Sequence, residues 1–245
     1  MPGLDAFTSL QREVILRETR VGGEYRAPRI MLAPPHAQWR EGMQPSLKRA
    51  MDILGAGSLL LILAPALLFL ILLVRADGGA AFFGHRRIGR SGRDFGCLKF
   101  RSMVVDSQAR LEALLASDPA ALVEWEATHK LKNDPRVTRV GRFLRATSLD
   151  ELPQLINVLV GEMSLVGPRP VIQAELDRFY GAAAAHYMSV RPGITGLWQV
   201  SGRSDTSYAQ RVALDVAYVS RPSIWQDISI LLRTPLAVLS RRGAC

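Results

Sequence analysis

The chain has 245 residues, and its 31 lysines and arginines outnumber 22 acidic residues, giving a net charge of +9 and a pI near 10.2. This excess favours anionic partners such as phosphorylated ligands, nucleic acid or an anionic membrane face. Aromatic residues make up only 7% and do not alternate with the basic ones, so nucleic acid is disfavoured. The two cysteines, Cys97 and Cys245, form no spaced motif, which indicates neither a zinc site nor a disulfide scaffold and suits a reducing compartment.

The first 45 residues mix charge, glycine and proline without sustained periodicity. They also lack the continuous apolar region of a signal peptide. We therefore predict a mostly flexible N-terminal tail over residues 1–45.

An uncharged apolar run of 22 residues, 53–74, follows the tail. About 20 such residues suffice to cross a bilayer, and a buried core helix is the alternative. Pro65 lies near the middle and predicts a bend, because it removes a helix hydrogen bond. Lys48 and Arg49 precede the run and five arginines follow it, so the positive-inside tendency places both ends on the cytoplasmic side. A re-entrant helix, broken at Pro65 and occupying 46–76, satisfies both features; a straight crossing is the alternative.

A glycine-rich segment comes next and contains Phe95–Phe100, which we predict as a strand. Lys99 and Arg101 project from one side of such a strand. They are either phosphate ligands or solvated edge charges. Residues 104–132 then read as a surface helix or a helix pair broken near Pro119, to which we assign no chemistry.

Residues 130–145 carry six basic side chains against one acid. Arg139, Arg142 and Arg145 are spaced by three, so on a helix they form one stripe. A solvated face is the usual meaning of such a stripe. Here, however, it leads directly into an acidic pair, and a carboxylate that attacks a phosphate needs cations to offset the repulsion between the two anions.

The segment that follows is predicted to be a helix with one buried side. Its apolar residues recur at helical spacing from Leu149 to Val160, which leaves Asp150, Gln154 and Asn157 on the opposite, polar side. Ser148 and Glu151 fit a capping box. Because Pro153 would clash inside an established helix, we place the first turn at Ser148 to Asp150.

Asp150 and Glu151 are the main catalytic candidates. Unpaired backbone N–H groups and the positive end of the macrodipole would favour their ionised forms. Neighbouring helical residues point about 100° apart, so one acid can act as nucleophile and the other as metal ligand. Ordinary capping is the competing interpretation. Gly161 is predicted to end the helix, and the GPRP turn that follows presents Arg169.

The remaining sequence carries fewer chemical signals. Residues 171–187 look like an ordinary helix, and 191–203 read as a loop with a short strand at 197–200. Tyr208–Ser220 is predicted as an amphipathic helix. The end, 223–239, mixes tryptophan, aliphatic and basic residues, which suits either a membrane-surface helix or a helix docked into the core.

Four motifs now support a resemblance to a known family. They are KFRSM at 99–103, NDPRVTRVGRFLRATSLDELPQ at 133–154, GEMSLVGPRP at 161–170 and RPGITGLWQVSGR at 191–203. Together they resemble the bacterial sugar transferases that start polysaccharide assembly, the monotopic polyprenyl-phosphate phosphoglycosyl transferases. The resemblance runs from about Ser46 to the C-terminus. It is greatest to the short members that begin exopolysaccharide synthesis, such as undecaprenyl-phosphate galactose phosphotransferases; the additional N-terminal membrane helices of longer relatives are not expected here.

The resemblance implies a reaction in which a hexose-1-phosphate, galactose or glucose, moves from a UDP-sugar to undecaprenyl phosphate and UMP is released. By similarity, Asp150 is the nucleophile that forms a phospho-sugar intermediate. Glu151 would hold Mg²⁺, which offsets the charge of the diphosphate.

The resemblance also implies the surrounding binding groups. Lys99, Arg101 and Arg145 fall where the family has basic or phosphate-binding residues. Arg169 is a candidate contact for the nucleotide or its phosphate. Gln154, on the same side of the helix as Asp150, is a further substrate-binding candidate.

The implied fold class is α+β, mainly helical, in a membrane-associated monotopic protein. A re-entrant membrane helix (46–76) would carry a cytoplasmic catalytic domain (77–245) with small β elements and amphipathic helices at the membrane surface. The implied location is the cytoplasmic face of the bacterial inner membrane; the oligomeric state is left open. The family often has Ser-Pro at the helix break, whereas this chain has Ala64-Pro65, which keeps the proline but removes a hydroxyl.

Three other functions compete with this interpretation. A glycosyltransferase using a UDP-sugar would release UDP instead of UMP. A membrane-anchored scaffold would use its basic face only to bind anionic lipid. A nucleic-acid binder would show steeply salt-dependent binding, but the apolar run and the few aromatic residues disfavour it.

Overall fold

A computed structural model describes residues 45–128, 131–202 and 206–239. The predicted tail therefore lies, except for its last residue, outside the described part. The described chain forms two compact units. We call them the large unit (45–62, 84–98 and 154–239) and the small unit (63–83 and 99–153), and describe each by itself.

The apolar run forms one helix, α3 (Pro45–Arg75), which passes through Pro65 without ending. By length and composition it suffices to cross a membrane, and only 11% of its most apolar window is buried within the protein. The low burial argues against a core helix. Because α3 is continuous through Pro65, the predicted helix–break–helix is not confirmed, and the re-entrant path stays a prediction.

A two-stranded hairpin follows, with β1 (Phe82–Ile88) and β2 (Asp94–Phe100) joined through a 3-10 turn at Arg90–Gly92. Strand β2 confirms the strand predicted at Phe95–Phe100. Strand β1 was not predicted, because all of its residues except the last two are exposed and it shows no alternation of buried and exposed positions.

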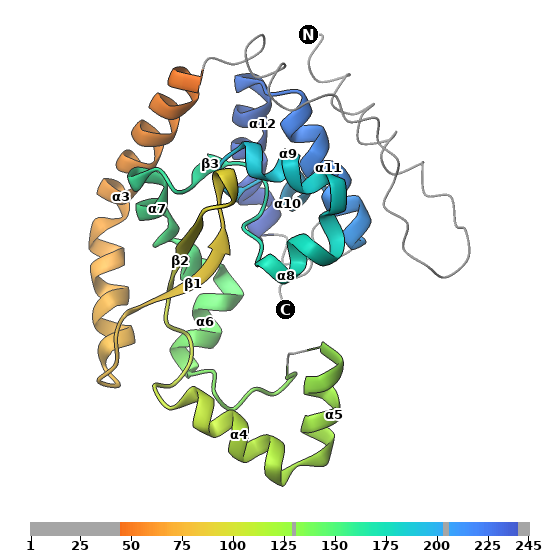
Figure 1. The fold of residues 1–245 in the computed structure, drawn as a ribbon. Coiled ribbons are helices and arrows are strands. Elements are labelled where there is room, and N and C mark those ends of the chain that lie inside the picture. Colours follow the sequence, from red (N-terminus) through yellow and green to blue (C-terminus); the bar gives the residue numbers. More distant parts are fainter. Residues whose placement is uncertain (1–44, 129–130, 203–205, 240–245) are drawn as a thin grey trace. The chain divides into compact units, whose positions relative to one another are not determined.

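The small unit is mainly helical (Figure 1). Its other elements are α4 (Ser107–Ser117), α5 (Pro119–Thr128), α6 (Arg139–Thr147) and the 3-10 turn η2 (Leu149–Glu151). Pro119 begins α5, as the predicted break requires. The core of this unit consists of Leu70, Val74, Phe100 and Leu144, with Leu149 packed against them.

The large unit wraps short elements around a parallel strand pair, β3 (Ser164–Val166) with β4 (Gly193–Thr195). Its helices are α7 (Gln154–Val160), α8 (Gln173–Glu175), η3 (Leu176–Tyr180), η4 (Gly181–Ala183), α9 (Ala184–Ser189), α10 (Leu197–Ser201), α11 (Tyr208–Ser220) and α12 (Ile224–Leu239).

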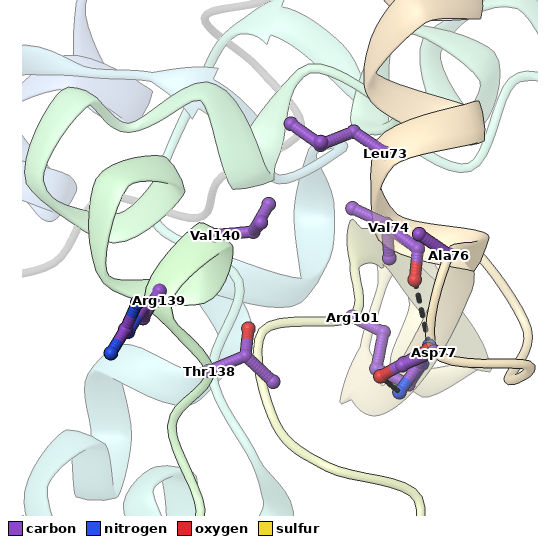
Figure 2. A pocket seen from close by; sticks show the side chains of 8 residues that line it. All are labelled: Leu73, Val74, Ala76, Asp77, Arg101, Thr138, Arg139 and Val140. Atoms are coloured by element: carbon purple, nitrogen blue, oxygen red, sulfur yellow. Dashed lines mark hydrogen bonds and ion pairs between the residues drawn. The ribbon is translucent and has the colours of Figure 1, made fainter.

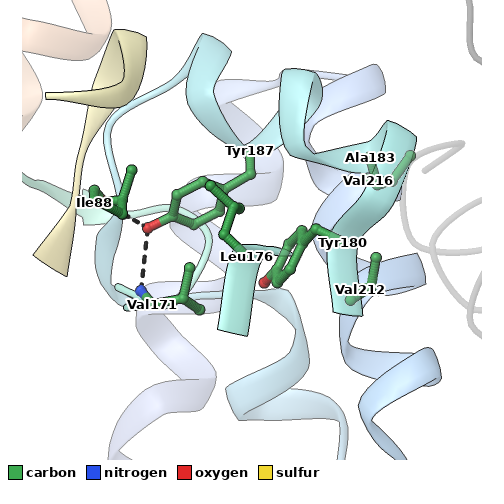
Figure 3. Close-up of a cluster of buried hydrophobic side chains, with 8 residues drawn as sticks. All are labelled: Ile88, Val171, Leu176, Tyr180, Ala183, Tyr187, Val212 and Val216. Atoms are coloured by element: carbon green, nitrogen blue, oxygen red, sulfur yellow. Dashed lines mark hydrogen bonds between the residues drawn. The ribbon is translucent and has the colours of Figure 1, made fainter. Parts of the chain in front are cut away.

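Tyr187 ties the core of the large unit to the hairpin, as Figure 3 shows. Its hydroxyl donates to the carbonyl of Ile88 at 2.7 Å and accepts from the backbone N–H of Val171 at 3.2 Å. Val212 and Val216 of α11 close the same cluster. Helix α11 has the predicted bounds, and Ser207 caps it by accepting from the backbone N–H of Gln210.

The predicted orientation of the helix after the acidic pair is confirmed at Leu155, which is buried, but is wrong at five other positions. Gln154 and Asn157, expected on the exposed side, are buried, whereas Ile156, Leu159 and Val160 are exposed. The side chain of Asn157 explains the reversal, because its amide donates to the carbonyl of Gly96 and its oxygen accepts from Leu98 N–H, both at 2.9 Å. A buried amide with satisfied hydrogen bonds can replace an apolar side chain in the core.

Two further predictions need correction. The helix predicted over 171–187 is broken into α8, η3, η4 and α9, with Gly181 at a φ of 48°. The short strand predicted at 197–200 is the helix α10. A Cβ on Gly196 would stand 2.2 Å from the carbonyl oxygen of Gly167, so glycine lets the chain turn there from β4 into α10.

Candidate active site

The acidic pair lies in a tight turn between two helices. Helix α6 ends at Thr147, Ser148 adopts a left-handed conformation with a φ of 57°, and Asp150 and Glu151 occupy the 3-10 turn η2. The predicted capping box is therefore wrong, since Ser148 makes no side-chain cap and the N–H of Glu151 already donates to the carbonyl of Ser148. Gly161 does end α7, with a φ of 90°, as predicted.

Hydrophobic packing holds this turn in place. Leu149 packs against the core of the small unit, which contains the fully buried Leu144 of α6 and Phe100 at the end of β2. The same core therefore fixes the residue before Asp150 and the residue after Lys99. This is how two segments fifty residues apart in sequence bring their charges together.

Lys99 is the cation of the acidic pair. Its Nζ lies 2.5 Å from Oε1 of Glu151 and 3.6 Å from Oδ2 of Asp150. The side chain of Asp150 is 14% exposed, whereas that of Glu151 is 40% exposed. The two carboxylates thus share a cation but differ in their access to water.

Burial raises the pKa of Asp150 above its usual value of 3.8, and Lys99 opposes this shift. The charge of Glu151 adds to the rise, and Arg145 opposes it more weakly than Lys99 does. A carboxylate with few water contacts loses less hydration when it meets another group. Asp150 therefore suits a nucleophile, provided that Lys99 keeps it ionised.

Arg145, near the end of α6, is a second cation whose charge acts on Asp150. Its Nε donates to Oγ of Ser102 at 2.9 Å, and its terminal nitrogens have no protein acceptor among the described residues. Gly141 permits this arrangement, because a Cβ there would stand 2.0 Å from the carbonyl oxygen of Ser102. Neither Ser102 nor Gly141 was among the predicted site residues; the spacing of the sequence carries no signal for such a close backbone approach.

Arg101 occupies a different place from the acidic pair. Its guanidinium pairs with both carboxylate oxygens of Asp77 and also donates to the backbone carbonyls of Val74, Ala80 and Met103. All five of its N–H donors are therefore engaged. We call this arrangement the Arg101–Asp77 clasp; phosphate binding by Arg101 stays a prediction and would require an exchange of partners.

Two predicted binding residues belong to the large unit. Gln154, the first residue of α7, is 3% exposed. The guanidinium of Arg169 lies 5.9 Å from the ring centre of Trp198, and Arg211 lies 4.7 Å from the same ring on α10. Arg169 thus belongs to a cationic and aromatic group that its turn sequence alone did not indicate.

The acidic pair fits a magnesium ion better than a closed metal cage. Within 45–128, 131–202 and 206–239 there is no group of three or more histidine, cysteine, aspartate or glutamate side chains placed to hold a metal. Mg²⁺ keeps several waters and is commonly held by one or two carboxylates together with substrate phosphates. Glu151, being the more exposed acid, is the residue suited to that role.

Comparisons with known proteins show the family of the chain. A family model described as bacterial sugar transferase matches residues 43–241. The chain is 59% identical over 198 residues to the UDP-galactose-lipid carrier transferase of Erwinia amylovora, and 54% identical to the undecaprenyl-phosphate galactose phosphotransferase of Salmonella typhimurium. Each alignment covers 81% of this chain and 41% of the relative, so the chain spans less than half the length of these proteins.

A shorter relative is matched along most of its length. The exopolysaccharide production protein ExoY of Rhizobium meliloti is 52% identical over 198 residues, which cover 80% of this chain and 87% of that protein. The region that the family model matches, residues 43–241, spans the acidic pair, Lys99 and the GPRP turn. The chain therefore belongs to the bacterial sugar transferase family.

Proposed function

We propose that the chain transfers a hexose-1-phosphate from a UDP-sugar to undecaprenyl phosphate, as the first membrane step of exopolysaccharide synthesis. The observation that carries this proposal is the placement of Asp150, which is largely withdrawn from water yet lies beside Lys99 and Glu151. The family membership and the names of the relatives from Erwinia, Salmonella and Rhizobium agree with it.

The proposed chemistry has two displacements at one phosphorus atom. A carboxylate oxygen of Asp150 attacks the β-phosphorus of the donor, and the bond to the bridging oxygen breaks, so that UMP leaves with the bonding electrons. An oxygen of undecaprenyl phosphate then attacks the same phosphorus and displaces the carboxylate. Asp150 is thereby regenerated, and the product is the lipid diphosphate sugar.

The other charged groups would offset the negative charge of the phosphates and keep Asp150 ionised during these displacements. Lys99 keeps Asp150 ionised and offsets the negative charge of the incoming diphosphate. Arg145 has terminal donors available for a phosphate oxygen. Glu151 would hold Mg²⁺, which supplies charge neutralisation at the diphosphate.

Intact-mass spectrometry tests the covalent step. Incubation with UDP-hexose and Mg²⁺, without lipid, should make the wild-type protein heavier by one hexose phosphate and release UMP. Asp150→Asn should show neither change and should lose at least about 10⁴-fold in turnover, because it removes the nucleophile. Equal masses of wild type before and after donor treatment would defeat the mechanism, and release of UDP would indicate a glycosyltransferase instead.

We propose galactose as the sugar, because the relatives from Erwinia and Salmonella are named for it. Relatives named for glucose, such as that of Caulobacter vibrioides, are only 39% identical. Parallel reactions with UDP-galactose and UDP-glucose measure the preference directly. A larger kcat/KM for UDP-glucose would contradict the assignment.

We also propose that α3 enters the cytoplasmic face of the inner membrane and returns to it. The basic residues on both flanks and Pro65 within the helix support this path. Single cysteines at Ser46 and Gly78 should both react with a membrane-impermeant reagent only from the cytoplasmic side. Labelling from opposite sides would mean that α3 crosses the bilayer.

A further inference from the structure

A pocket of about 290 Å³ lies in the small unit where α3 ends and α6 begins. We call it the α3–α6 pocket. Its lining residues, drawn in Figure 2, are Leu73, Val74, Ala76, Asp77, Arg101, Thr138, Arg139 and Val140. Its volume is close to the lower end of small-molecule sites, about 300 Å³.

The polar groups around the pocket already have partners. The Arg101–Asp77 clasp uses every donor of the guanidinium, and Oγ1 of Thr138 accepts from the N–H of Gly141 at 2.8 Å. Figure 2 shows the guanidinium of Arg139 directed away from Leu73 and Val74. The remaining walls are aliphatic, so the pocket suits hydrocarbon, because an apolar occupant leaves no buried polar group unpaired.

The pocket continues an apolar surface of the helix that is suited to the membrane. Leu68, Phe69 and Leu72 of α3 are 58%, 63% and 63% exposed, and Leu73, which lines the pocket, is 37% exposed. An occupant can therefore enter along α3 from the hydrocarbon region. Exposed apolar surface of this kind on a helix with so little burial is expected to face lipid.

The pocket and the acidic pair lie at opposite ends of α6. The helix begins at Arg139 beside the pocket and reaches Arg145 just before Asp150; its nine residues span about 13 Å. Phe143 is 53% exposed and lies one turn after Val140, so it extends an apolar path along the helix. A phosphate at Asp150 that carries a long hydrocarbon chain matches this arrangement.

We propose that the α3–α6 pocket binds the hydrocarbon chain of the lipid phosphate acceptor, in the part of the chain close to its phosphate. This inference rests on the proposed function, because it assigns one of the two substrates of that reaction. It further implies that the donor half of the reaction does not depend on the pocket.

Two variants test the pocket by different means. Ala76→Trp fills it from an exposed position, and Leu73→Ser removes part of its apolar wall. With undecaprenyl phosphate in detergent micelles, both should raise the KM for the lipid by about tenfold or more, the range that methylene-sized changes produce in apolar pockets. Leu61→Trp, at an exposed leucine of α3 that lies outside the pocket and outside the entry path, is the matched control and should keep the wild-type KM.

Adduct formation without lipid distinguishes the possible failures. It should be the same in wild type, Leu73→Ser and Leu61→Trp, because no lipid takes part. An unchanged lipid KM in Leu73→Ser, with normal adduct, overturns the inference and leaves the proposed function intact. Absence of the adduct in wild type instead overturns the proposed function. If Ala76→Trp also fails to form the adduct, the substitution has disturbed folding. The KM of Leu73→Ser for the lipid then decides whether the pocket binds the acceptor.

A phospholipid competitor tests the choice of occupant. If the pocket served bulk phospholipid, dioleoylphosphatidylglycerol would inhibit transfer by wild type and not by Ala76→Trp, which would overturn the assignment to the acceptor. We expect instead that added phosphatidylglycerol changes the KM for undecaprenyl phosphate equally in both proteins, because it dilutes the substrate within the micelle.

Discussion

Each unit places one lysine between two acids, yet the two groups differ in almost every physical respect. In the small unit, Lys99 contacts Asp150 and Glu151, whose side chains are 14% and 40% exposed. In the large unit, Nζ of Lys48 lies 2.7 Å from Asp227 and 3.4 Å from Asp52, whose side chains are 0% and 1% exposed.

The buried group is also closed by further hydrogen bonds. Asp52 accepts from the hydroxyl of Ser164 and from the N–H of Leu165, while the hydroxyl of Tyr218 donates to Asp227 at 2.9 Å. Within the part of the chain that the structure describes, Asp150 pairs with no side chain other than Lys99. Both groups contain opposite charges. They differ in whether the carboxylates have all of their hydrogen-bond partners within the protein, and this difference separates a structural ion cluster from one that can bind and react.

The largest expected contrast comes from replacing each lysine by methionine. Lys48→Met should lower the free energy of unfolding by about 3–5 kcal/mol, because it leaves buried carboxylates without their cation. Lys99→Met should change it by less than about 1 kcal/mol, since that pair is partly solvated, but should lower turnover at least about 100-fold. Unfolding measurements in detergent and turnover assays determine the two effects. Equal losses of stability in the two variants would contradict the contrast between a structural and a reactive ion cluster.

A second prediction concerns Asp215, a buried acid of the large unit whose pKa burial raises to about 7. Between about pH 4 and 7 the folded protein holds a proton on Asp215 that the unfolded chain has lost, so stability should fall as pH rises, by at most about 4 kcal/mol. Asp215→Asn should flatten this slope in a pH series of unfolding measurements.

Tyr180 supplies the control for Asp215. Its hydroxyl donates to the carboxyl at 2.8 Å, and this bond lowers the pKa that burial raises. Tyr180→Phe should therefore extend the stability loss to higher pH, while its onset and slope stay the same. A slope that persists in Asp215→Asn would assign the titration to another group.

The catalytic activity of the small unit should also depend on pH. The rate of adduct formation should fall as Asp150 becomes protonated, at a pH above the usual aspartate value of 3.8, because burial raises its pKa. Lys99→Met should move that midpoint further up, since Lys99 is the main group that lowers the pKa. Arg145→Gln should move it less, and single-turnover rates across pH measure all three proteins.

The smallest effects are expected at the Arg101–Asp77 clasp. Arg101→Lys should lower stability by about 1–2 kcal/mol, because lysine cannot reproduce the paired geometry. Asp77→Asn should act in the same direction and leave the KM for the UDP-sugar unchanged, since Asp77 is no proposed ligand. A raised donor KM in Arg101→Lys alone, without loss of stability, would instead support the predicted phosphate contact.

The sequence predicted the elements whose signals are local and periodic. The apolar run, the helix at 208–220 and the strand β2 follow directly from hydrophobic spacing. The family motifs pointed to Asp150, Glu151 and Lys99, and the structure brings these three together. Each of these correct predictions depends on residues close together in the sequence or on a family motif.

What the sequence did not predict depends on contacts between distant segments. The left-handed Ser148 shortens the turn before Asp150, and nothing in its own side chain demands that conformation. The role of Asp77 becomes visible only when α3 and the end of β2 are folded together. Likewise, the burial of Asn157 contradicts its polarity until the backbone groups that it bonds are known.

The hydrogen bonds of Asn157 also protect the edge of strand β2 against pairing with other chains. An edge strand with free N–H and C=O groups recruits other strands, and proteins normally guard such edges. Here one amide occupies the N–H of Leu98 and the carbonyl of Gly96, while its NH₂ also reaches Glu162 at 2.6 Å. The Asn157 side chain thus covers these two backbone groups of β2. An aspartate at this position could still accept from Leu98 N–H, but it would face a second negative charge at Glu162 and would leave the carbonyl of Gly96 open to another strand.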